Sequence, residues 1–265
     1  MPSLEERKQK EIEYYDRKAG EWLKDNRSRK IITDFEGFNF NLLSSFRFCY
    51  EYLKDKCRDK KFLDYGCGNG IHSIFPAKQG AQVIGIDLSE PSLKIAGERA
   101  KREGVEDKIR FLAMDCEKMG FPDNYFDIIF DGGTFSSIDL DKAYLELERI
   151  LKPQGFLLGI ETFGHNPFTN LKRKINKLMG KRTTWAAGHI LKTKDLEKAK
   201  DYFNKVEVHY FHLISWLGFP LLHFPGGKTL LRMLEFLDNI LLGLPFLRKY
   251  AFKVVFIFSE PKKND

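Results

Sequence analysis

The nine residues 62–70, which read F-L-D-Y-G-C-G-N-G, constrain this chain more than any other segment. A short apolar run ends at Asp64, and three alternating glycines, Gly66, Gly68 and Gly70, follow before a helical pattern begins. Glycine has no Cβ, so a turn of this kind lets the backbone pass close to a ligand. The segment therefore predicts a strand, a glycine turn and a helix that together hold a nucleotide-like cofactor.

The glycine spacing departs from the dinucleotide fingerprint G-x-G-x-x-G, which would need a glycine where Ile71 stands. Here the glycines alternate, and Asp64 stands two residues before the first of them. This pattern closely resembles motif I of the class I S-adenosylmethionine (SAM) dependent methyltransferases. The resemblance implies that Asp64 lies near the methionine end of SAM. It also implies that Gly66 and Gly68, with Cys67 between them, face the ribose and sulfonium region.

A second acid ends the next apolar run, residues 81–87. Asp87 ends that run about twenty residues after the glycines, the distance at which a second parallel strand brings an acid to a ribose. One carboxylate can accept hydrogen bonds from both ribose hydroxyls, and we expect Leu88 to lie beside the cofactor as well. An ordinary strand-end or helix-capping role is the alternative for Asp87, as for each acid taken singly.

A third acid follows the run 109–113. The family binds adenine after its third strand, so the resemblance implies that Asp115 accepts from the exocyclic amine and that Cys116 offers its backbone N–H. The N-terminal helix resembles the family's cofactor lid, and Tyr14 and Tyr15 are candidates to touch SAM.

The composition fits one folded catalytic domain with additions. The chain has 265 residues, 43% hydrophobic and 14% aromatic, which is enough to bury a sizeable core. Its four cysteines show no C-x-x-C spacing, and we recognise neither a metal site nor a signal peptide. These features predict reduced thiols and a cytoplasmic location.

Strand and helix patterns alternate, which predicts an α/β fold with a doubly wound, mostly parallel, seven-stranded Rossmann-like sheet. We expect the strands at 62–64, 81–87, 109–113, 125–130, 156–160, 206–212 and 252–258, and helices at 3–26, 41–56, 71–79, 91–103 and 141–151. We divide this single structural domain into an N-terminal helical lid (1–56), a SAM-binding core (57–163), a basic helical substrate-side segment (164–203), and the last two strands with an apolar helical insert (204–265, insert 213–251).

Residues after the fourth and fifth strands are expected to face the transferable methyl group, because ligands of open α/β sheets bind beyond the carboxyl ends of the strands. These residues are 131–137 and 161–167, and Asp131 is a further candidate to contact the cofactor. Many small-molecule members of the family carry a histidine pair where Ser136 and Ser137 stand, so the usual base candidate is missing.

His165 is the candidate replacement for that base, because imidazole titrates near neutrality. Glu161 could orient the histidine or bind a substrate hydroxyl. Alternatively, His165 and Asn166 could cap a following helix.

Residues 171–182 contain six basic residues and no acid, with apolar residues at helical spacing. This pattern predicts a basic amphipathic helix. It could be a solvated helix packed on the core, or it could attract an anionic surface such as phospholipid head groups, a phosphorylated substrate or RNA. The net charge of +7 is compatible with each of these partners.

The family commonly joins its last two strands by a short hairpin, whereas here the insert 213–251 intervenes, rich in Leu, Phe and Pro. Charged residues, prolines and glycines interrupt it, so it contains no apolar span of about 20 residues, the length that crosses a membrane. The insert could form an apolar lid over the methyl group or dock on a bilayer. It could also complete the core or a dimer interface.

These features predict a SAM-dependent methyltransferase that methylates an O (or N) atom of a small apolar or amphiphilic acceptor, with S-adenosyl-L-homocysteine as product. The acceptor classes are a lipid, an isoprenoid, a quinone-like molecule or another natural product, and a membrane surface is a further candidate partner. An RNA methyltransferase is an alternative, although no RNA-binding module is recognisable and nucleic acid is not the expected partner. A non-catalytic SAM-fold partner protein is a third hypothesis, which the presence of all three acids disfavours.

Overall fold

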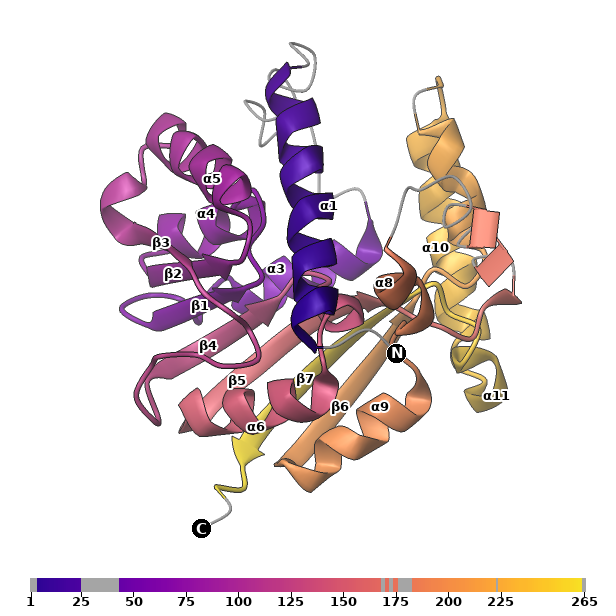
Figure 1. Cartoon of the computed structure of the whole chain (residues 1–265). Helices are drawn as coiled ribbons and strands as arrows, with labels where there is room; N and C mark the ends of the chain where they lie inside the picture. Colours follow the sequence, from indigo (N-terminus) through magenta and orange to yellow (C-terminus); the bar gives the residue numbers. More distant parts are fainter. Residues whose placement is uncertain are drawn as a thin grey trace.

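The computed structural model describes residues 4–24, 43–167, 170–171, 174–175, 183–222 and 224–263. Within this part of the chain, seven strands form one sheet in the order β3-β2-β1-β4-β5-β7-β6 (Figure 1). Strands β1 to β5 run parallel, whereas β7 is antiparallel to both of its neighbours. The predicted Rossmann-like fold, mostly parallel with seven strands, is confirmed. The strands are β1 Lys61–Tyr65, β2 Gln82–Asp87, β3 Ile109–Ala113, β4 Phe126–Asp131, β5 Leu151–Thr162, β6 Phe203–Phe211 and β7 Lys253–Pro261.

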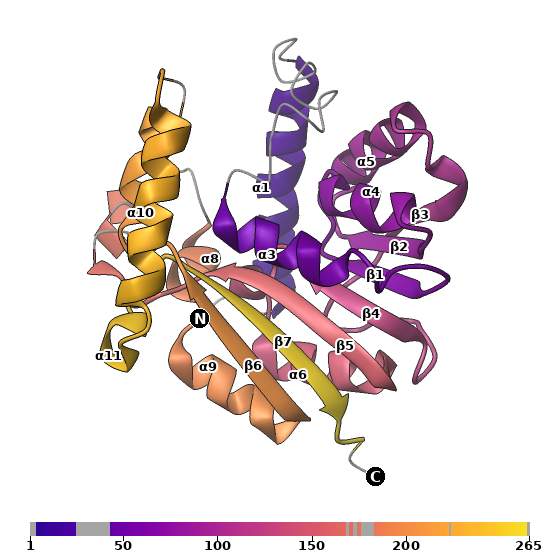
Figure 2. The same cartoon turned by 180° about the vertical axis from the view of Figure 1, so that it is seen from behind.

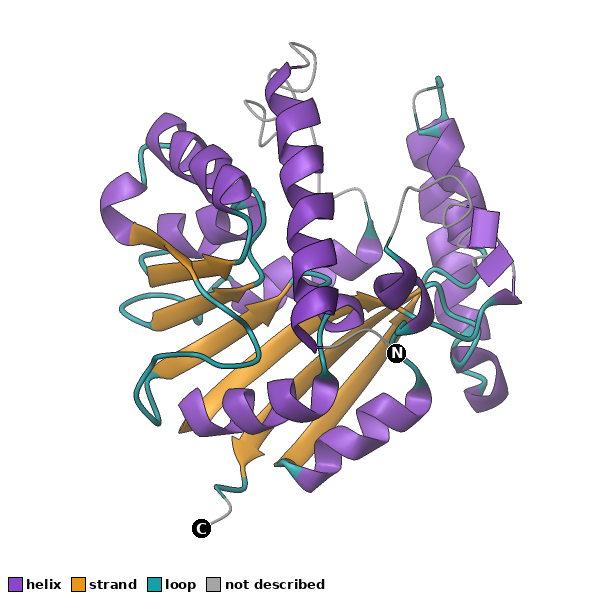
Figure 3. Cartoon of the chain, in the orientation of Figure 1, coloured by secondary structure: helices purple, strands orange, loops and turns teal. Residues whose placement is uncertain are grey.

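Helices connect the strands and begin the chain, whereas the chain ends after strand β7 (Figure 3). The α-helices are α1 Leu4–Lys24, α3 Ser44–Leu53, α4 Ile71–Lys78, α5 Glu90–Arg102, α6 Leu140–Ile150, α8 Thr184–Gly188, α9 Thr193–Lys198, α10 Gly227–Leu241 and α11 Pro245–Arg248. Short 3₁₀ helices are η2 Glu106–Lys108, η3 Phe135–Ser137, η4 Ala199–Asp201 and η5 Ser215–Leu221.

The central strands are buried on both faces of the sheet. Phe62 and Ile128 pack on the side of α3, α4 and α5, whereas their neighbours Leu63 and Ile129 pack on the side of α6 and α9 (Figure 2). Successive side chains of a strand point to opposite faces, so a run that is apolar throughout fills both cores. This is why the apolar runs, which do not alternate with polar residues, become the middle of the sheet.

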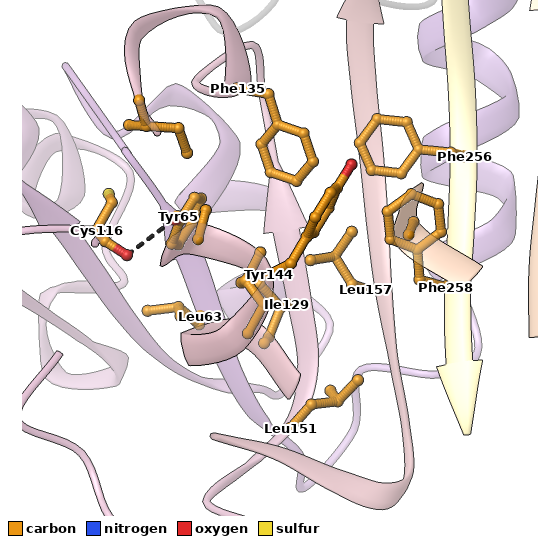
Figure 4. Packing of buried hydrophobic residues seen from close by; sticks show 14 of the residues in the cluster. Leu63, Tyr65, Cys116, Ile129, Phe135, Tyr144, Leu151, Leu157, Phe256 and Phe258 are labelled. Atoms are coloured by element: carbon orange, nitrogen blue, oxygen red, sulfur yellow. Dashed lines mark hydrogen bonds between the residues drawn. The ribbon is translucent and has the colours of Figure 1, made fainter. Parts of the chain in front are cut away.

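Aromatic rings fill the core on the α6 side (Figure 4). Phe135 packs against Tyr144 and Phe256, with ring centroids 5.8 and 5.2 Å away. At the end of β1, the hydroxyl of Tyr65 donates to the carbonyl oxygen of Cys116 at 2.9 Å. This buried hydrogen bond holds the segment that follows β3 against the end of β1. The residues that follow both strands line one cavity.

Strand β5 begins earlier than expected. We predicted a helix at 141–151 and a strand at 156–160, but β5 starts at Leu151, directly after α6. Phe126 pairs with Leu151 and Ile128 with Phe156, so 152–155 stand outside the regular pairing with β4. Proline, which cannot donate a ladder hydrogen bond, is tolerated at such an irregularity.

The insert 213–251 lies at the same edge of the sheet as the carboxyl ends of β1 to β5. It leaves the carboxyl end of β6, which runs parallel to β5 because both are antiparallel to β7. The insert contains η5, α10 and α11, and α1 and α10 both extend beyond this edge (Figure 1, Figure 2). Most of the predicted basic helix 171–182 lies outside the described residues; Leu171, Lys174 and Ile175 are helical and exposed.

Candidate functional site

A cavity of about 460 Å³ lies beyond the carboxyl ends of β1 to β4, beneath α1. Its volume falls within the range of about 300–1,000 Å³ that is typical of small-molecule and cofactor sites. The glycine turn, the ends of β2 and β3, the segment after β4 and one face of α1 line it. Most of the predicted cofactor residues are in this lining: Tyr15, Gly66, Cys67, Gly68, Asp87, Leu88, Asp115 and Cys116.

Gly66 and Gly68 have different roles in the turn. Gly66 and Gly68 both have a positive φ, +67° and +50°, which favours glycine. A Cβ at Gly66 would lie 2.2 Å from Oγ1 of Thr134, so this glycine permits close packing inside the protein. A Cβ at Gly68 would meet nothing within 4 Å, and Gly68 lines the cavity. Gly68 is therefore the position at which the bare backbone faces a ligand.

Asp87 connects the turn to the end of β2. Its Oδ2 accepts from the backbone N–H of Gly68 at 2.9 Å, and its Oδ1 accepts from the N–H of Ser89 at 2.8 Å. Burial raises the pKa of Asp87, and these backbone hydrogen bonds partly offset the effect. Each carboxylate oxygen has two lone pairs, so Asp87 keeps acceptor capacity toward the cavity. This geometry fits the predicted contact with two ribose hydroxyls.

Helix α1 covers the cavity and is fixed to the segment after β3 by three ion pairs, one of them between Lys8 and Glu117 at 3.4 Å. Arg7 pairs with Glu117, and Lys8 pairs with Oδ2 of Asp115, whose Oδ1 accepts from the backbone N–H of Glu117 at 2.9 Å. One hydroxyl of the lid, that of Tyr15, lies 3.5 Å from Oγ of Ser137. We did not predict Arg7 or Lys8 as site residues. Their position about two helical turns before Tyr15, in the expected lid, could have identified them as site residues.

Asp64 and Asp131 do not line the cavity, although we expected both at the cofactor. Asp64 is 1% exposed and accepts from Oγ of Ser73 at 2.6 Å. Burial raises the pKa of Asp64 to about 7. Asp131 is fully buried, its Oδ1 accepts from the N–H of Thr134 at 2.9 Å, and burial together with the charge of Glu161 raises its pKa. Asp64 therefore stabilises the start of α4, and Asp131 stabilises the segment after β4. Both segments contribute residues to the cavity lining.

The two predicted catalytic residues also lie outside the cavity lining. Nε2 of His165 accepts from the backbone N–H of Thr193 at 3.2 Å, at the first residue of α9. Burial and the charges of Lys192 and Lys249 lower the pKa of His165. Glu161 is buried near Asp131. His165 thus contacts the N-terminus of α9, which is not the next helix in the chain, so the predicted cap is a different contact. The catalytic roles of His165 and Glu161 stay predictions.

One histidine that we did not single out does line the cavity. His72 is the second residue of α4, next to Gly132, and its Nδ1 lies 2.9 Å from the hydroxyl of Tyr50. Burial lowers the pKa of His72 to about 3, so the imidazole is neutral. Its position follows from the sequence once the helix after the glycine turn is expected to begin at the cofactor. Across the described part of the chain, no cluster of three His, Cys, Asp or Glu side chains could hold a metal ion.

Comparison with known proteins identifies the core of the chain. The profile of a protein family described as a methyltransferase domain matches residues 63–159. A sterol 24-C-methyltransferase from Gibberella zeae is 40% identical over 101 residues, which are 36% of this chain and 26% of that protein. A demethylmenaquinone methyltransferase from Bacteroides fragilis is 36% identical over 107 residues, which are 39% of this chain and 44% of that protein. The chain therefore spans less than half the length of these curated relatives.

Solved structures extend the likeness of the fold to most of the chain. Geranyl diphosphate C-methyltransferase from Streptomyces coelicolor, solved with Mg²⁺, geranyl diphosphate and S-adenosyl-L-homocysteine, superposes with a TM-score of 0.56 at 16% identity, covering 81% of this chain and 79% of that one. A phosphoethanolamine N-methyltransferase from Haemonchus contortus, solved with S-adenosylhomocysteine, gives 0.53 at 21% identity, covering 77% and 49%. At these identities the likeness shows the fold alone.

Proposed function

Because residues 63–159 form a class I SAM-dependent methyltransferase domain, we propose that this chain transfers a methyl group from SAM to a small apolar or amphiphilic acceptor. The cofactor of this family is SAM, and S-adenosyl-L-homocysteine is its product. One observation carries the proposal: Gly68 and Asp87 are hydrogen-bonded to each other in the wall of a cavity that also exposes Asp115.

Charged groups of both signs line the cavity. Asp87 and Asp115 lie at the strand ends, and Lys8 and Lys18 lie on the lid helix α1. Gly68 and Asp87 would hold the ribose side, and Asp115 with Cys116 the adenine side. When bound, SAM supplies a methyl group that its sulfonium already activates.

The protein's contribution to the reaction is proposed to be positioning and exclusion of water. Helix α1 covers the cavity and is held by Arg7 and Lys8. Orientation of two reactants can supply about 7–11 kcal/mol of the barrier. His72 can form a hydrogen bond to the methyl-accepting molecule as a neutral imidazole. Because its pKa is lowered to about 3, it is a weak base.

The acceptor atom is proposed to be oxygen or nitrogen of a lipid, isoprenoid, quinone-like or natural-product molecule. Carbon is the second candidate, because the sterol relative is named for methylation at carbon 24. Relatives named for sterols and demethylmenaquinone support an apolar acceptor class. We also propose a cytoplasmic protein in peripheral contact with a membrane through 171–182 and 213–251, because basic and apolar residues dominate these two segments.

Transfer of a labelled methyl group tests this proposal. The protein is incubated with methyl-labelled SAM and, separately, with a total lipid extract or total RNA. We expect label in the organic phase, and loss of about 100-fold in rate with Asp87→Ala at subsaturating SAM, since two hydrogen bonds to a charged group contribute about 3 kcal/mol.

Asp127→Ala is the matched control for this experiment. Asp127 also accepts from a backbone N–H, that of Lys61 at 3.0 Å, but it lies at the opposite edge of the sheet. Label in RNA alone would favour the RNA alternative. No transfer to any extract, with SAM binding intact, would favour the non-catalytic alternative.

A further inference from the structure

Helix α10 is amphipathic in reverse: its acids face the protein and its apolar side chains face outward. The buried positions are Leu231, Glu235, Asp238 and Leu242, at the spacing of one helical face. The exposed positions on the other faces include Leu230, Met233, Phe236, Leu237 and Ile240. A surface helix of a globular protein normally shows the opposite arrangement.

The buried acids hold this orientation firmly. Glu235 accepts from the backbone N–H of Ser44 at 2.7 Å and pairs with the guanidinium of Arg47 at 2.5 Å. Asp238 accepts from the backbone N–H of Ile214 at 2.8 Å and of Ser215 at 3.2 Å. Turning the helix over would leave these three backbone donors without their acceptors, which destabilises the fold. The outward apolar face is therefore fixed by the fold.

The outward face is large and carries bulky side chains. Phe236 is 65% exposed, Met233 62% and Ile240 59%, and Phe246 of α11, the next helix in the chain, is also 65% exposed. Isolated exposed apolar residues are ordinary, whereas a contiguous apolar face on one helix marks a binding surface.

The charges around this face have one sign. The insert 213–251 contains two acids, Glu235 and Asp238, and both are buried. Its four basic residues, Lys228, Arg232, Arg248 and Lys249, are all exposed. Among the described residues, none of the four takes part in an ion pair. The face thus combines apolar side chains with uncompensated positive charge.

We propose that the outer face of α10 and α11 docks on a membrane surface that contains anionic lipids. Bulky apolar side chains with flanking cations suit the boundary between acyl chains and anionic head groups, because each Lys or Arg near the surface is attracted to the head groups. Within the described ranges the structure has no helix with the length and apolarity to cross a bilayer, so the contact is peripheral.

A second copy of the chain fits this face less well. In a twofold dimer the same patch meets itself, so four cations would oppose four cations with no exposed acid of the insert between them. Like charges across an interface repel, whereas anionic head groups neutralise them.

Docking through this face would place the cavity in a fixed relation to the lipid surface. Helix α3 connects the two: its first residue, Ser44, bonds to Glu235, and its Tyr50 bonds to His72 in the cavity wall. The insert also lies at the same edge of the sheet as the strand ends that border the cavity (Figure 2). This inference deepens the proposed function, because a methyl acceptor of the lipid class would then be taken from the membrane.

Vesicle flotation of the full chain tests the proposal. Vesicles of phosphatidylcholine alone are compared with vesicles that also contain phosphatidylglycerol. We expect binding at least about tenfold stronger to the anionic vesicles, falling as salt rises from about 0.1 M to about 1 M because the Debye length shortens. Phe236→Glu should reduce binding at least about tenfold, as should the double variant Lys228→Glu, Arg232→Glu on anionic vesicles.

Leu145→Glu is the matched control, since Leu145 is 54% exposed on α6, away from the insert. It should float like the wild type. The variants at Phe236, Lys228 with Arg232, and Leu145 should retain wild-type SAM affinity, which shows that they are folded. Asp87→Ala, which should lose SAM affinity, should still float, so that this proposal and the methyl-transfer proposal fail separately. Equal flotation of Phe236→Glu and wild type would overturn the inference. So would a wild-type dimer that does not bind vesicles and that Phe236→Glu dissociates in sedimentation equilibrium, because a second copy would then cover the face.

Discussion

Two acids in different halves of the molecule make nearly the same backbone hydrogen bonds. Asp87, half-buried at the end of β2, accepts from the N–H groups of Gly68 and Ser89, and Asp238, buried on α10, accepts from two backbone N–H groups that follow β6. Burial raises the pKa of both carboxyls. Only Asp87 lines the cavity. Backbone hydrogen bonds to a carboxylate therefore indicate a structural role. Such a carboxylate can also bind a ligand only where it lines a cavity, as Asp87 does.

Asp64 offers the largest expected effect, because it is an acid beneath the cavity with few compensating bonds. Its folded pKa, about 7, lies above its unfolded value, so stability is lost as pH rises through about 4 to about 7. Asp64→Asn should therefore add up to about 4 kcal/mol to the free energy of unfolding at about pH 8 and almost nothing at about pH 4. Urea denaturation at the two pH values measures this. An equal effect at both would contradict the assignment of the raised pKa to Asp64.

Asp238 is the counterpart in the insert. Asp238→Ala leaves the N–H groups of Ile214 and Ser215 without their acceptor, so we expect a loss of about 2–3 kcal/mol in the free energy of unfolding. SAM affinity should stay within about twofold, because Asp238 does not line the cavity.

A surface acid provides the control for that measurement. Glu197→Ala removes an exposed ion pair with Lys200 and should change stability by less than about 0.5 kcal/mol. A large fall in SAM affinity with Asp238→Ala would mean that the two halves are coupled and that the contrast between their acids is wrong.

His165 gives the smallest expected effect. Since its Nε2 accepts from the first N–H of α9 outside the cavity, His165→Ala should cost about 1 kcal/mol of stability and less than about threefold in methyl transfer. Rates measured across pH, with His165→Asn as the conservative variant, check this. A fall of about 100-fold in rate, without a change in SAM affinity, would support the predicted catalytic base instead.

The cofactor half could be predicted from sequence because its signals are local. Continuous apolar runs, the alternating glycines and acids at strand ends indicated the strand positions and most of the cavity lining. Asp64 and Asp131 were expected in the lining for the same reason, but a strand-end position does not reveal whether a side chain points into the cavity or behind its wall.

The insert was less predictable because hydropathy does not say which face of a helix turns inward. Glu235 and Asp238 look like interruptions of an apolar segment, yet their partners, Ser44 and Ile214, make them the inner face. The lid contacts of Arg7 and Lys8 depend likewise on acids more than 100 residues away in the chain. Contacts of this kind arise from the tertiary fold and leave no local pattern.

Calorimetric titration of SAM into the wild type and Asp87→Ala, with Asp238→Ala beside them, tests the central claim most directly. The account predicts wild-type binding between micromolar and submillimolar concentrations, a loss of about 100-fold with Asp87→Ala, and a change within about twofold with Asp238→Ala. Unchanged affinity in Asp87→Ala would contradict the assignment of Asp87 and its cavity to the cofactor.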